Sequence, residues 1–425
     1  MMKRTLLFLF LFMAAVPVTL PAQEYSLSEL YSIALERSKS IKIAEEELYL
    51  SERDKDRATA VLTPALSAFG SSTEYSNSGS SLPDNSTAWG LKLGQSISMS
   101  GRELTAMDIA KETIVKSRFD LDTVRGNYLL SVATSYYDVL KSKKALEIIN
   151  ANVERLTKHR DAAKIRLKVG ESTKTVLLRA EAELSGAQSD LIRADNALKF
   201  TKVLLARTVG ISNDFDLKED QPYAISTMTL DSLKQTALSE RAELKSSGLQ
   251  KEIADKQIKY TKGLYWPSLS VEGVYSKKED HPSISSSNSE NIYGVLSINY
   301  PLFDGGLRKA EVRQAEARLR QADYRLQDMQ DSVNVEVDNA YLNLATVSGV
   351  LEKLRSEVEY AKDNYNSVTK QFEYGLADSI DIMDANTLLV TSERQLANAQ
   401  YDQQLALLIL QRATGTLLKT VAGNQ

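Results

Sequence analysis

The sequence predicts a mostly helical α+β membrane protein, in which two tandem repeats each combine long helices with one β-hairpin. Three observations predict this class. The chain repeats itself at an offset of 205 residues, two 68-residue stretches contain no proline, and two pairs of short segments alternate apolar with small polar residues. A unit of about 200 residues is far longer than a solenoid repeat, so each half is a large element of a symmetric assembly.

The internal repeat is clearest around its glycines. Gly170 reappears as Gly375, and the leucines and alanines that follow keep the same offset. Before the hairpins the offset becomes 203, as in the step from Pro64 to Pro267. We therefore expect a signal peptide at 1–22, a first repeat at 23–210, an inter-repeat linker at 211–229, a second repeat at 230–415 and a tail at 416–425. The linker should form part of a small belt around the middle of the assembly.

The N-terminus has the features of a secretory signal. Lys3 and Arg4 form a charged region, an apolar core follows at 5–16, and Ala22 precedes the expected cleavage before Gln23. No later stretch offers the run of about eighteen apolar residues that a membrane-spanning helix needs. We therefore expect an exported protein from which residues 1–22 are removed.

The composition argues against an enzyme. The chain has no cysteine and two histidines, His159 and His281, which we expect on the surface because polar side chains are mostly exposed. Without cysteine we expect no disulfides, no thiolate metal sites and no lipid anchor on an N-terminal cysteine. The sequence also has no Gly-rich phosphate loop. We therefore expect no catalytic residues, no cofactor and no metal site.

The charge balance argues against nucleic acid as a partner. Lys and Arg number 52 against 56 Asp and Glu, for a net charge of −4. Removal of the signal peptide takes away Lys3 and Arg4, which leaves the mature chain at about −6. A mildly acidic exported chain has no basic field that would attract nucleic acid.

Two long helices are expected at 102–169 and 307–374. Neither stretch contains proline, and a heptad runs through both with valine or leucine at its d-like positions. At about 1.5 Å per residue each helix would be roughly 100 Å long. Helices of this length must pack against others as a coiled coil or a helical tube.

Each long helix is followed by a glycine turn and a shorter return helix. Gly170 and Gly375 can adopt the left-handed conformation that ends a helix. The return helices are expected at 175–209 and 378–414. Two further amphipathic segments of similar length precede the hairpins, at 27–60 and 230–262. The lengths indicate that one long helix runs beside two shorter ones in each repeat.

The β-hairpins are expected at about 65–99 and 268–302. In the first, Trp89, Leu91 and Leu93 share one face, opposite small or polar residues. Strands of about eleven residues with one apolar and one small polar face suit a tilted crossing of an outer membrane. The alternative is a soluble β-sandwich sheet, because each strand of a membrane barrel gives a weak signal.

The four strands of one chain also bear on its oligomeric state. Four strands cannot close a barrel, and an open sheet edge cannot face lipid. The chain must therefore borrow strands from copies of itself. Three copies would supply twelve strands, an even number that closes, and the duplication would make the assembly pseudo-sixfold.

Two local sequences, together with the duplication, resemble the TolC family of outer-membrane efflux and secretion channels. They are the strand-to-helix junction at 300–306 and the turn at 374–385, which reads YGLADSIDIMDA. The resemblance covers essentially the whole mature sequence. It implies a homotrimer in the cell outer membrane, with a twelve-stranded β-barrel that continues into a twelve-helix α-barrel through the periplasm.

The same resemblance implies the function of an exit duct in a tripartite efflux pump or a type I secretion system. Substrates would pass passively. Drugs and proteins stay open as cargo, and metals are disfavoured because the five methionines of the mature chain are scattered rather than clustered. The implied partners are further copies of the chain, outer-membrane lipid, a periplasmic adaptor and an inner-membrane pump of the RND, ABC or MFS class. The alternative is a periplasmic or surface coiled-coil structural protein, which would explain the helices but not the two hairpins.

The family carries rings of aspartates at its periplasmic gate, and the resemblance places them here at Asp381 and Asp384. Their i, i+3 spacing puts both on one helical face, so threefold symmetry would gather six carboxylates at one constriction. Such a ring attracts cations and can bind multivalent ones. The alternative is that these acids only complement the start of a helix, with Asp378 as the N-cap.

The gate also departs from the family pattern. Thr175 is followed by Val176 where the family has an acid, Phe372 stands in place of a tyrosine, and Ala377 in place of a bridging arginine. The aspartates are thus kept while their partners are missing. We expect a closed state held more weakly, or held by packing of Phe372 and Val176.

The two helix turns are the expected contacts for the adaptor, since they are the periplasmic loops of the chain. The alternative is that they are merely tight turns. The residues concerned lie within 169–173 and 374–377, and the central ones are Val169, Gly170, Glu171, Tyr374, Gly375 and Leu376.

Overall fold

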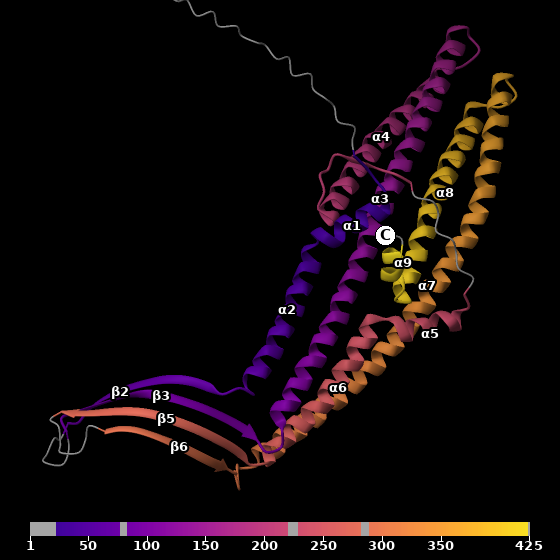
Figure 1. Ribbon diagram of the computed structural model, residues 1–425. Helices are drawn as coiled ribbons and strands as arrows, with labels where there is room; N and C mark the ends of the chain where they lie inside the picture. The colour runs from indigo at the N-terminus through magenta and orange to yellow at the C-terminus, as the bar shows by residue number, and fades with distance from the viewer. Residues whose placement is uncertain (1–22, 77–82, 220–227, 282–288, 424–425) are drawn as a thin grey trace, which may run out of the picture.

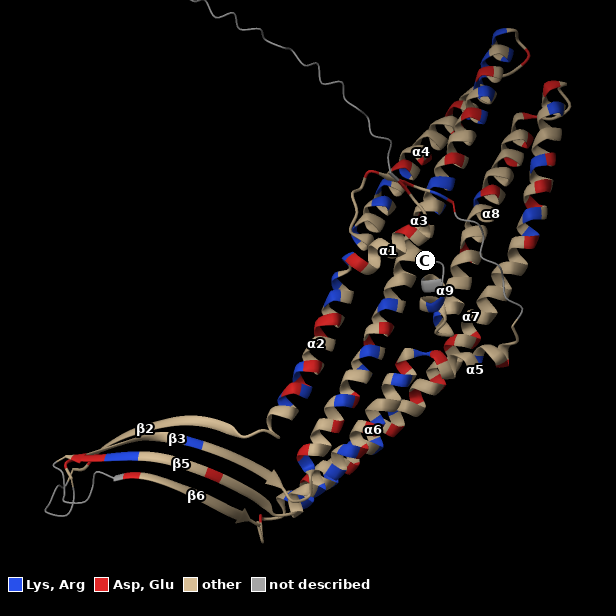
Figure 2. Ribbon diagram, in the orientation of Figure 1, with Lys and Arg blue, Asp and Glu red and all other residues tan. Residues whose placement is uncertain are grey.

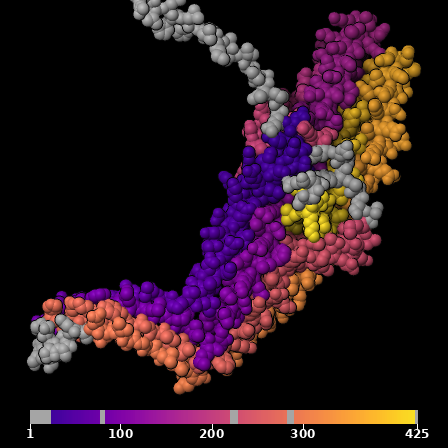
Figure 3. All heavy atoms as spheres, in the orientation of Figure 1, coloured from indigo at the N-terminus to yellow at the C-terminus, as the bar shows by residue number. Residues whose placement is uncertain are grey.

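The computed structural model is an elongated set of antiparallel helices with a β-sheet at one end (Figure 1). It describes residues 23–76, 83–219, 228–281 and 289–423. The signal peptide expected at 1–22 lies outside the described residues, as do parts of both hairpin loops and of the inter-repeat linker. In the space-filling view the sheet projects from the helical body as an arm (Figure 3).

The elements follow the same order in both halves of the chain. The first half contains β1 (Gln23–Tyr25), α1 (Leu27–Arg37), α2 (Lys39–Ala60), β2 (Ala65–Glu74), β3 (Asn85–Ser98), α3 (Arg102–Lys168) and α4 (Lys174–Val209). The second contains β4 (Phe215–Leu217), α5 (Leu230–Glu240), α6 (Ala242–Lys262), η1 (Gly263–Tyr265), β5 (Ser268–His281), β6 (Ser289–Asn299), α7 (Leu307–Glu373), α8 (Ser379–Ala413) and α9 (Leu417–Gly423).

The two long helices, α3 and α7, have 67 residues each and end in the same way. Gly170 and Gly375 take φ values of 80° and 74°, which favour glycine. In the first turn the amide of Glu171 donates to the carbonyl of Arg166 at 2.9 Å, the bond that closes a Schellman motif. Among the helices of the described ranges, none is both long and apolar enough to cross a membrane.

The amphipathic segments before the hairpins are each divided into two helices, which the sequence did not predict. The break in the first repeat is at Ser38, with φ −60° and ψ 124°. The break in the second is at Arg241, with φ −59° and ψ 122°. These positions are related by the offset of 203, and the Ser38 hydroxyl caps α2 by accepting from the amide of Ile41 at 3.3 Å. The duplication therefore includes the break, which carries no glycine or proline.

Each long helix packs beside two shorter ones. Helix α3 contacts α2 and α4, α7 contacts α6 and α8, and α3 also contacts α6 and α8 across the repeats. The largest core cluster lies where these helices meet at mid-length, and it includes Leu30, Leu129, Tyr136 and Leu408. The contacts of α3 with α6 and α8 therefore join the two repeats into one body.

The sheet combines the two hairpins in the order β2-β3-β5-β6, with antiparallel neighbours throughout. Strand β3 pairs with β5 in a register that places Trp89 opposite Lys277. Gly90 is required in this sheet, because a Cβ there would lie 2.1 Å from the carbonyl oxygen of Tyr275 and 2.8 Å from the Phe69 ring. Within the described residues, β2 and β6 each have one edge that pairs with no strand.

The linker and the tail both join the mid-length core. Strand β4 lies in the expected linker and pairs in parallel with β1, where Phe215 is opposite Gln23. Phe215 is buried, and so is Leu417 in α9, which forms within the expected tail. Residues 220–227 of the linker lie outside the described residues.

Candidate functional site

The two helix turns lie at the same end of the molecule, opposite the sheet (Figure 1). We call them the first tip, between α3 and α4, and the second tip, between α7 and α8. The apolar side chains of Val169, Tyr374 and Leu376 are strongly exposed at these turns. Gly170, Glu171 and Gly375 are exposed beside them.

Two of the three aspartates at the second tip form the start of α8. Asp378 is the N-cap, and its Oδ1 accepts from the amides of Ile380 at 2.6 Å and Asp381 at 3.0 Å. The Asp381 carboxylate accepts in return from the amide of Asp378 at 2.8 Å. This is a capping box, so both acids have the helix-start role that was the alternative to a gate function.

Asp384 differs from its neighbours because its carboxylate makes no hydrogen bond or ion pair with the described residues. It is exposed and lines a hollow of about 430 Å³ between α7 and α8, together with Asp381. Gln371, Leu376 and Ala377 also line this hollow. The structure thus brings both candidate ring residues to one exposed surface.

Phe372 is buried at the centre of the contact between the two tips. The Arg166 guanidinium lies over its ring at 4.2 Å from the centroid. Nη2 of Arg166 also donates to the carbonyl of Phe372 at 2.9 Å and to that of Glu373 at 3.3 Å. These are carbonyls of the last turn of α7, where a cation is favourable. We call this contact of Arg166 with Phe372 and Glu373 the tip latch.

The remaining gate candidates pack around the latch. Phe372, Ala163 and Ile382 belong to one buried cluster, against which Val176 and Ala377 pack. The cluster thus holds residues of α3, α4, α7 and α8. Thr175 is exposed in the first turn of α4. Apolar packing therefore surrounds the positions where the family places charged partners.

His159 is buried, and the expectation that it lies on the surface is wrong. Its Nε2 is 3.1 Å from the hydroxyl of Ser379, the first residue of α8, and its ring centroid is 5.2 Å from that of Phe372. The start of α8 covers this part of α3, which the sequence of α3 does not reveal. Burial, followed by the charge of Arg166, lowers the pKa of His159. His281, in contrast, is exposed at the end of β5.

Further from the tips, polar side chains continue the contact between α3 and α8. Nε of Arg155 donates to Oδ1 of Asn386 at 3.0 Å, and the Asn386 amide donates to Asn152 at 2.8 Å. Arg155 also lies 3.6 Å from the Glu393 carboxylate. Sequence reasoning missed these residues, as it missed Arg166, because each needs its partner about 200 residues away.

Comparison with known proteins agrees with this architecture. Outer membrane protein TolC of Vibrio cholerae is 24% identical over 319 residues, which cover 73% of this chain and 73% of that protein. Alkaline protease secretion protein AprF of Pseudomonas aeruginosa is 24% identical over 313 residues, or 70% of this chain and 64% of AprF. The crystal structure of the outer membrane protein VceC from Vibrio cholerae aligns with a TM-score of 0.78 at 21% identity, covering 92% of this chain and 96% of VceC.

A family match follows the duplication. Residues 30–210 and 233–416 each match the family described as Outer membrane efflux protein. The two matched segments exclude the whole linker and together span most of the chain. The resemblance to TolC-family channels is thereby confirmed. The chain belongs to the outer membrane efflux protein family.

Proposed function

We propose that this protein is the outer-membrane exit duct of a tripartite efflux pump or a type I secretion system. The observation that carries the proposal is the pairing of an open four-stranded sheet at one end with two helix tips at the other, in a chain of this family. The duct catalyses no reaction, and substrates pass through it from the periplasm to the exterior.

A homotrimer would complete both the sheet and the helical body. The unpaired edges of β2 and β6 could pair between copies, which gives twelve strands from three chains. On α7, four exposed apolar side chains keep to one face: Tyr324, Val335, Leu342 and Tyr360. Helix α4 exposes a second apolar stripe at Leu178, Ile192 and Val203. Packing of the α4 stripe against the α7 stripe of a neighbouring copy would close a tube. Each chain would contribute two long helices and two pairs of shorter helices stacked end to end, which makes twelve helical rods from three chains.

The gate of this duct would lie at the tips. The tip latch and the buried cluster around Phe372 hold the helix pair α3–α4 against the helix pair α7–α8 of the same chain. In a trimer, Asp384 and Asp381 from three chains would form an acidic ring that selects cations. Residues 169–173 and 374–377 are the proposed contacts for a periplasmic adaptor, which would connect the duct to an inner-membrane RND, ABC or MFS pump.

Planar-bilayer recordings from the purified protein test the duct directly. We expect a cation-selective conductance that multivalent cations block from the tip side, because six carboxylates would surround one constriction. In the Asp381→Asn, Asp384→Asn double variant we expect at least a tenfold weaker block. Asparagine at 381 can still accept the capping bond, so the helix start should survive.

Asp363→Asn is the matched control for this experiment. Asp363 is an exposed acid of α7 with no ion pair among the described residues, so its loss should leave the block unchanged. An equal block in the double variant would reduce Asp381 and Asp384 to helix-start acids and leave the duct intact. A folded, heat-modifiable trimer that never conducts would overturn the duct itself.

Acid is expected to open the gate. The lowered pKa of His159 means that the folded tip disfavours the imidazolium, so the contact loses stability as pH falls below the ordinary histidine value of 6.5. Above that value this destabilisation is absent. We expect the open fraction in bilayers to rise several-fold between pH 7.5 and pH 5. The rise should vanish in His159→Gln and persist in His281→Gln, which removes the other histidine; persistence in both would assign it to other groups.

A further inference from the structure

The two tips carry opposite charge although they are copies of one unit. Between residues 155 and 180 there are eight basic and two acidic side chains. The equivalent stretch of the second repeat, 360–385, has two basic and five acidic side chains. At three equivalent positions the sign is inverted: Lys158 and Asp363, Lys168 and Glu373, and Arg179 and Asp384. In Figure 2 the Lys and Arg positions along the last turns of α3 are coloured blue on the ribbon.

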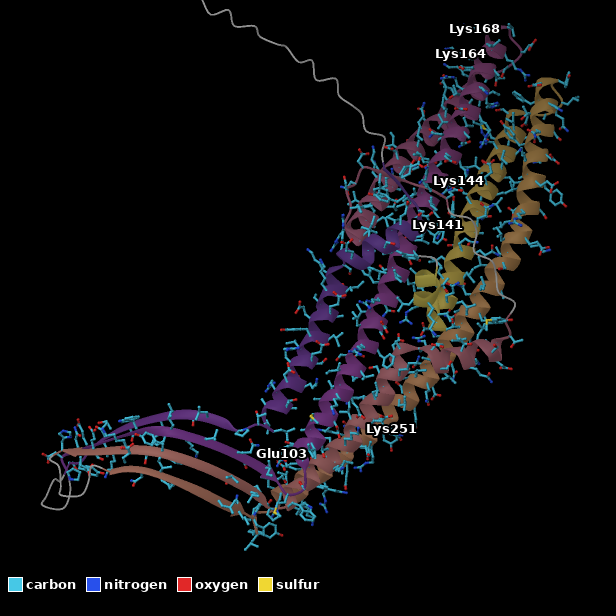
Figure 4. The ribbon with its side chains drawn as sticks, in the orientation of Figure 1. Glu103, Lys141, Lys144, Lys164, Lys168 and Lys251 are labelled. Carbon is cyan, nitrogen blue, oxygen red and sulfur yellow. The ribbon has the colours of Figure 1, made fainter. Side chains whose placement is uncertain are left out.

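Most of the cations at the first tip have no partner within the described residues. Arg155, Arg160 and Arg166 contact Glu393, Asp161 and the α7 carbonyls. The others are exposed and take part in no ion pair with a described residue: Lys158, Lys164, Lys168, Lys174 and Arg179. Lys164 and Lys168 lie close together at the end of α3 (Figure 4). Like charges at i, i+4 repel each other, so an anionic partner would stabilise this tip.

Lys164 and Lys168 face away from the second repeat of their own chain. The side chains of Arg155, His159 and Arg166 contact α7 and α8. With 3.6 residues per turn, the lysine pair is rotated by roughly 180° from those three positions. The pair also lies on α3, apart from the α4 stripe proposed to meet a neighbouring copy. The lysine pair would therefore stay exposed, covered neither by the second repeat of its own chain nor by a neighbouring copy.

Exposed apolar side chains lie next to the lysine pair. Ile165 and Val169 of α3 are each 63% exposed. Two apolar residues at i, i+4 beside two cations at i, i+4 form a ridge that suits a helix packing alongside. The complementary surface is an apolar stripe flanked by carboxylates, because opposite charges at the rim select the partner and its register.

We propose that the first tip is a docking surface for a helical protein partner with an apolar stripe flanked by acidic side chains. The inference rests on the proposed function, in which the tips bind an adaptor. It adds that the adaptor surface at the first tip is apolar and flanked by acidic side chains. The acidic second tip repels the same surface, so the two tips of one chain are different sites. A pseudo-sixfold ring of tips would then offer three sites of each kind.

Binding of two designed hairpins to the full-length protein in nanodiscs tests this proposal. Each probe is a disulfide-closed helical hairpin with leucine at the a and d positions, flanked by glutamate in one and by lysine in the other. We expect the glutamate hairpin to bind at least tenfold more tightly, and to weaken as salt rises. In the double variant Lys164→Glu, Lys168→Glu, the lysine hairpin should bind more tightly than the glutamate hairpin. If that variant does not assemble, the milder double variant Lys164→Gln, Lys168→Gln should reduce the preference for the glutamate hairpin.

Lys39→Glu, Lys42→Glu is the matched control, since both lysines are exposed on α2 and have no ion pair among the described residues. It makes the same change of charge and should leave binding unchanged. Equal binding of the two hairpins, no binding, or equal binding of an unfolded polyglutamate peptide would overturn the proposal. Bilayer conductance of the same preparations separates the questions: a conducting protein without the preference loses only the docking surface, and a non-conducting one loses the duct.

Discussion

Replacing Glu243 with Gln is expected to lower the free energy of unfolding by about 3–5 kcal/mol, because the carboxylate is shared by two buried arginines. Nε of Arg241 and Nη2 of Arg412 both contact it. The side chains of Arg241, Glu243 and Arg412 are 5%, 16% and 10% exposed. Removing one partner of a buried ion pair leaves a charge without compensation, which costs far more than the pair itself contributes.

The network around Glu243 explains why the effect should reach the whole fold. Arg241 also donates to Glu336 of α7 at 2.6 Å and to the carbonyl of Ala413 at 3.1 Å. Arg412 of α8 donates to Asn127 of α3 at 2.8 Å. The network therefore joins α3, α6, α7 and α8 at the break between α5 and α6. In Glu243→Gln, Arg241 keeps Glu336, while Arg412 loses its carboxylate.

The effect should depend on pH in a defined direction. Burial raises the pKa of Glu243, but Arg412 and Arg241 outweigh this, so the pKa lies below its ordinary value of 4.5. A carboxyl with a lowered pKa contributes stability that is present above the ordinary value and is lost as pH falls through the folded one. The free energy of unfolding should therefore differ most between the natural chain and Glu243→Gln at pH 7. This difference should shrink below about pH 4.5.

Thermal unfolding followed by circular dichroism measures this difference, and Asp323→Asn provides the control. Lys251 and Asp323 join α6 to α7 at 2.7 Å, but their side chains are 45% and 36% exposed. Lys251 lies where α6 runs beside α7 (Figure 4). An exposed pair contributes about 1 kcal/mol or less. We expect a midpoint about 3–6 °C lower in Glu243→Gln. Equal midpoints for the two variants would show that Glu243 is not needed as a charge.

The helices and strands could be predicted because their signals are local. A proline-free stretch bounded by glycines at 101 and 170 indicated a helix over 102–169, and the structure has it at Arg102–Lys168. Alternation in 87–99 indicated the strand that the structure places at Asn85–Ser98. The breaks at Ser38 and Arg241 were missed because neither glycine nor proline is present there. They depend instead on tertiary contacts, such as those of Arg241 with α7 and α8.

The candidate site was predictable only in part, for the same reason. The N-cap at Asp378 follows from the spacing of Asp378 and Asp381, which is a local pattern. The burial of His159 depends on Ser379, which is 220 residues further along the chain. A preference for surface positions cannot anticipate such a contact. The tip latch was missed for the same reason. Arg166 contacts the α7 carbonyls only once the helix pairs α3–α4 and α7–α8 have packed together.

Removing the tip latch is expected to open the channel. Arg166→Ala deletes hydrogen bonds of a charged donor, worth roughly 1.5–3 kcal/mol, and a cation–π contact worth about 0.5–2 kcal/mol. Arg166 is partly exposed, so a net loss of roughly 2 kcal/mol per chain is a conservative figure. Each loss of 1.4 kcal/mol changes an equilibrium about tenfold, so we expect the open fraction in planar bilayers to rise at least tenfold.

Arg160→Ala separates the latch from a general loss of charge at the first tip. Arg160 is six residues earlier in α3, and among the residues that the structure describes its one ion pair is with Asp161 on the same helix, at 2.7 Å. It makes no described contact with the second repeat, so its loss should leave the gate closed. A similar open fraction in both variants would mean that charge at the first tip, rather than the contact with α7, controls opening. An unchanged open fraction in Arg166→Ala would place the closing energy in the buried cluster of Phe372, Val176 and Ile382, which that variant leaves intact.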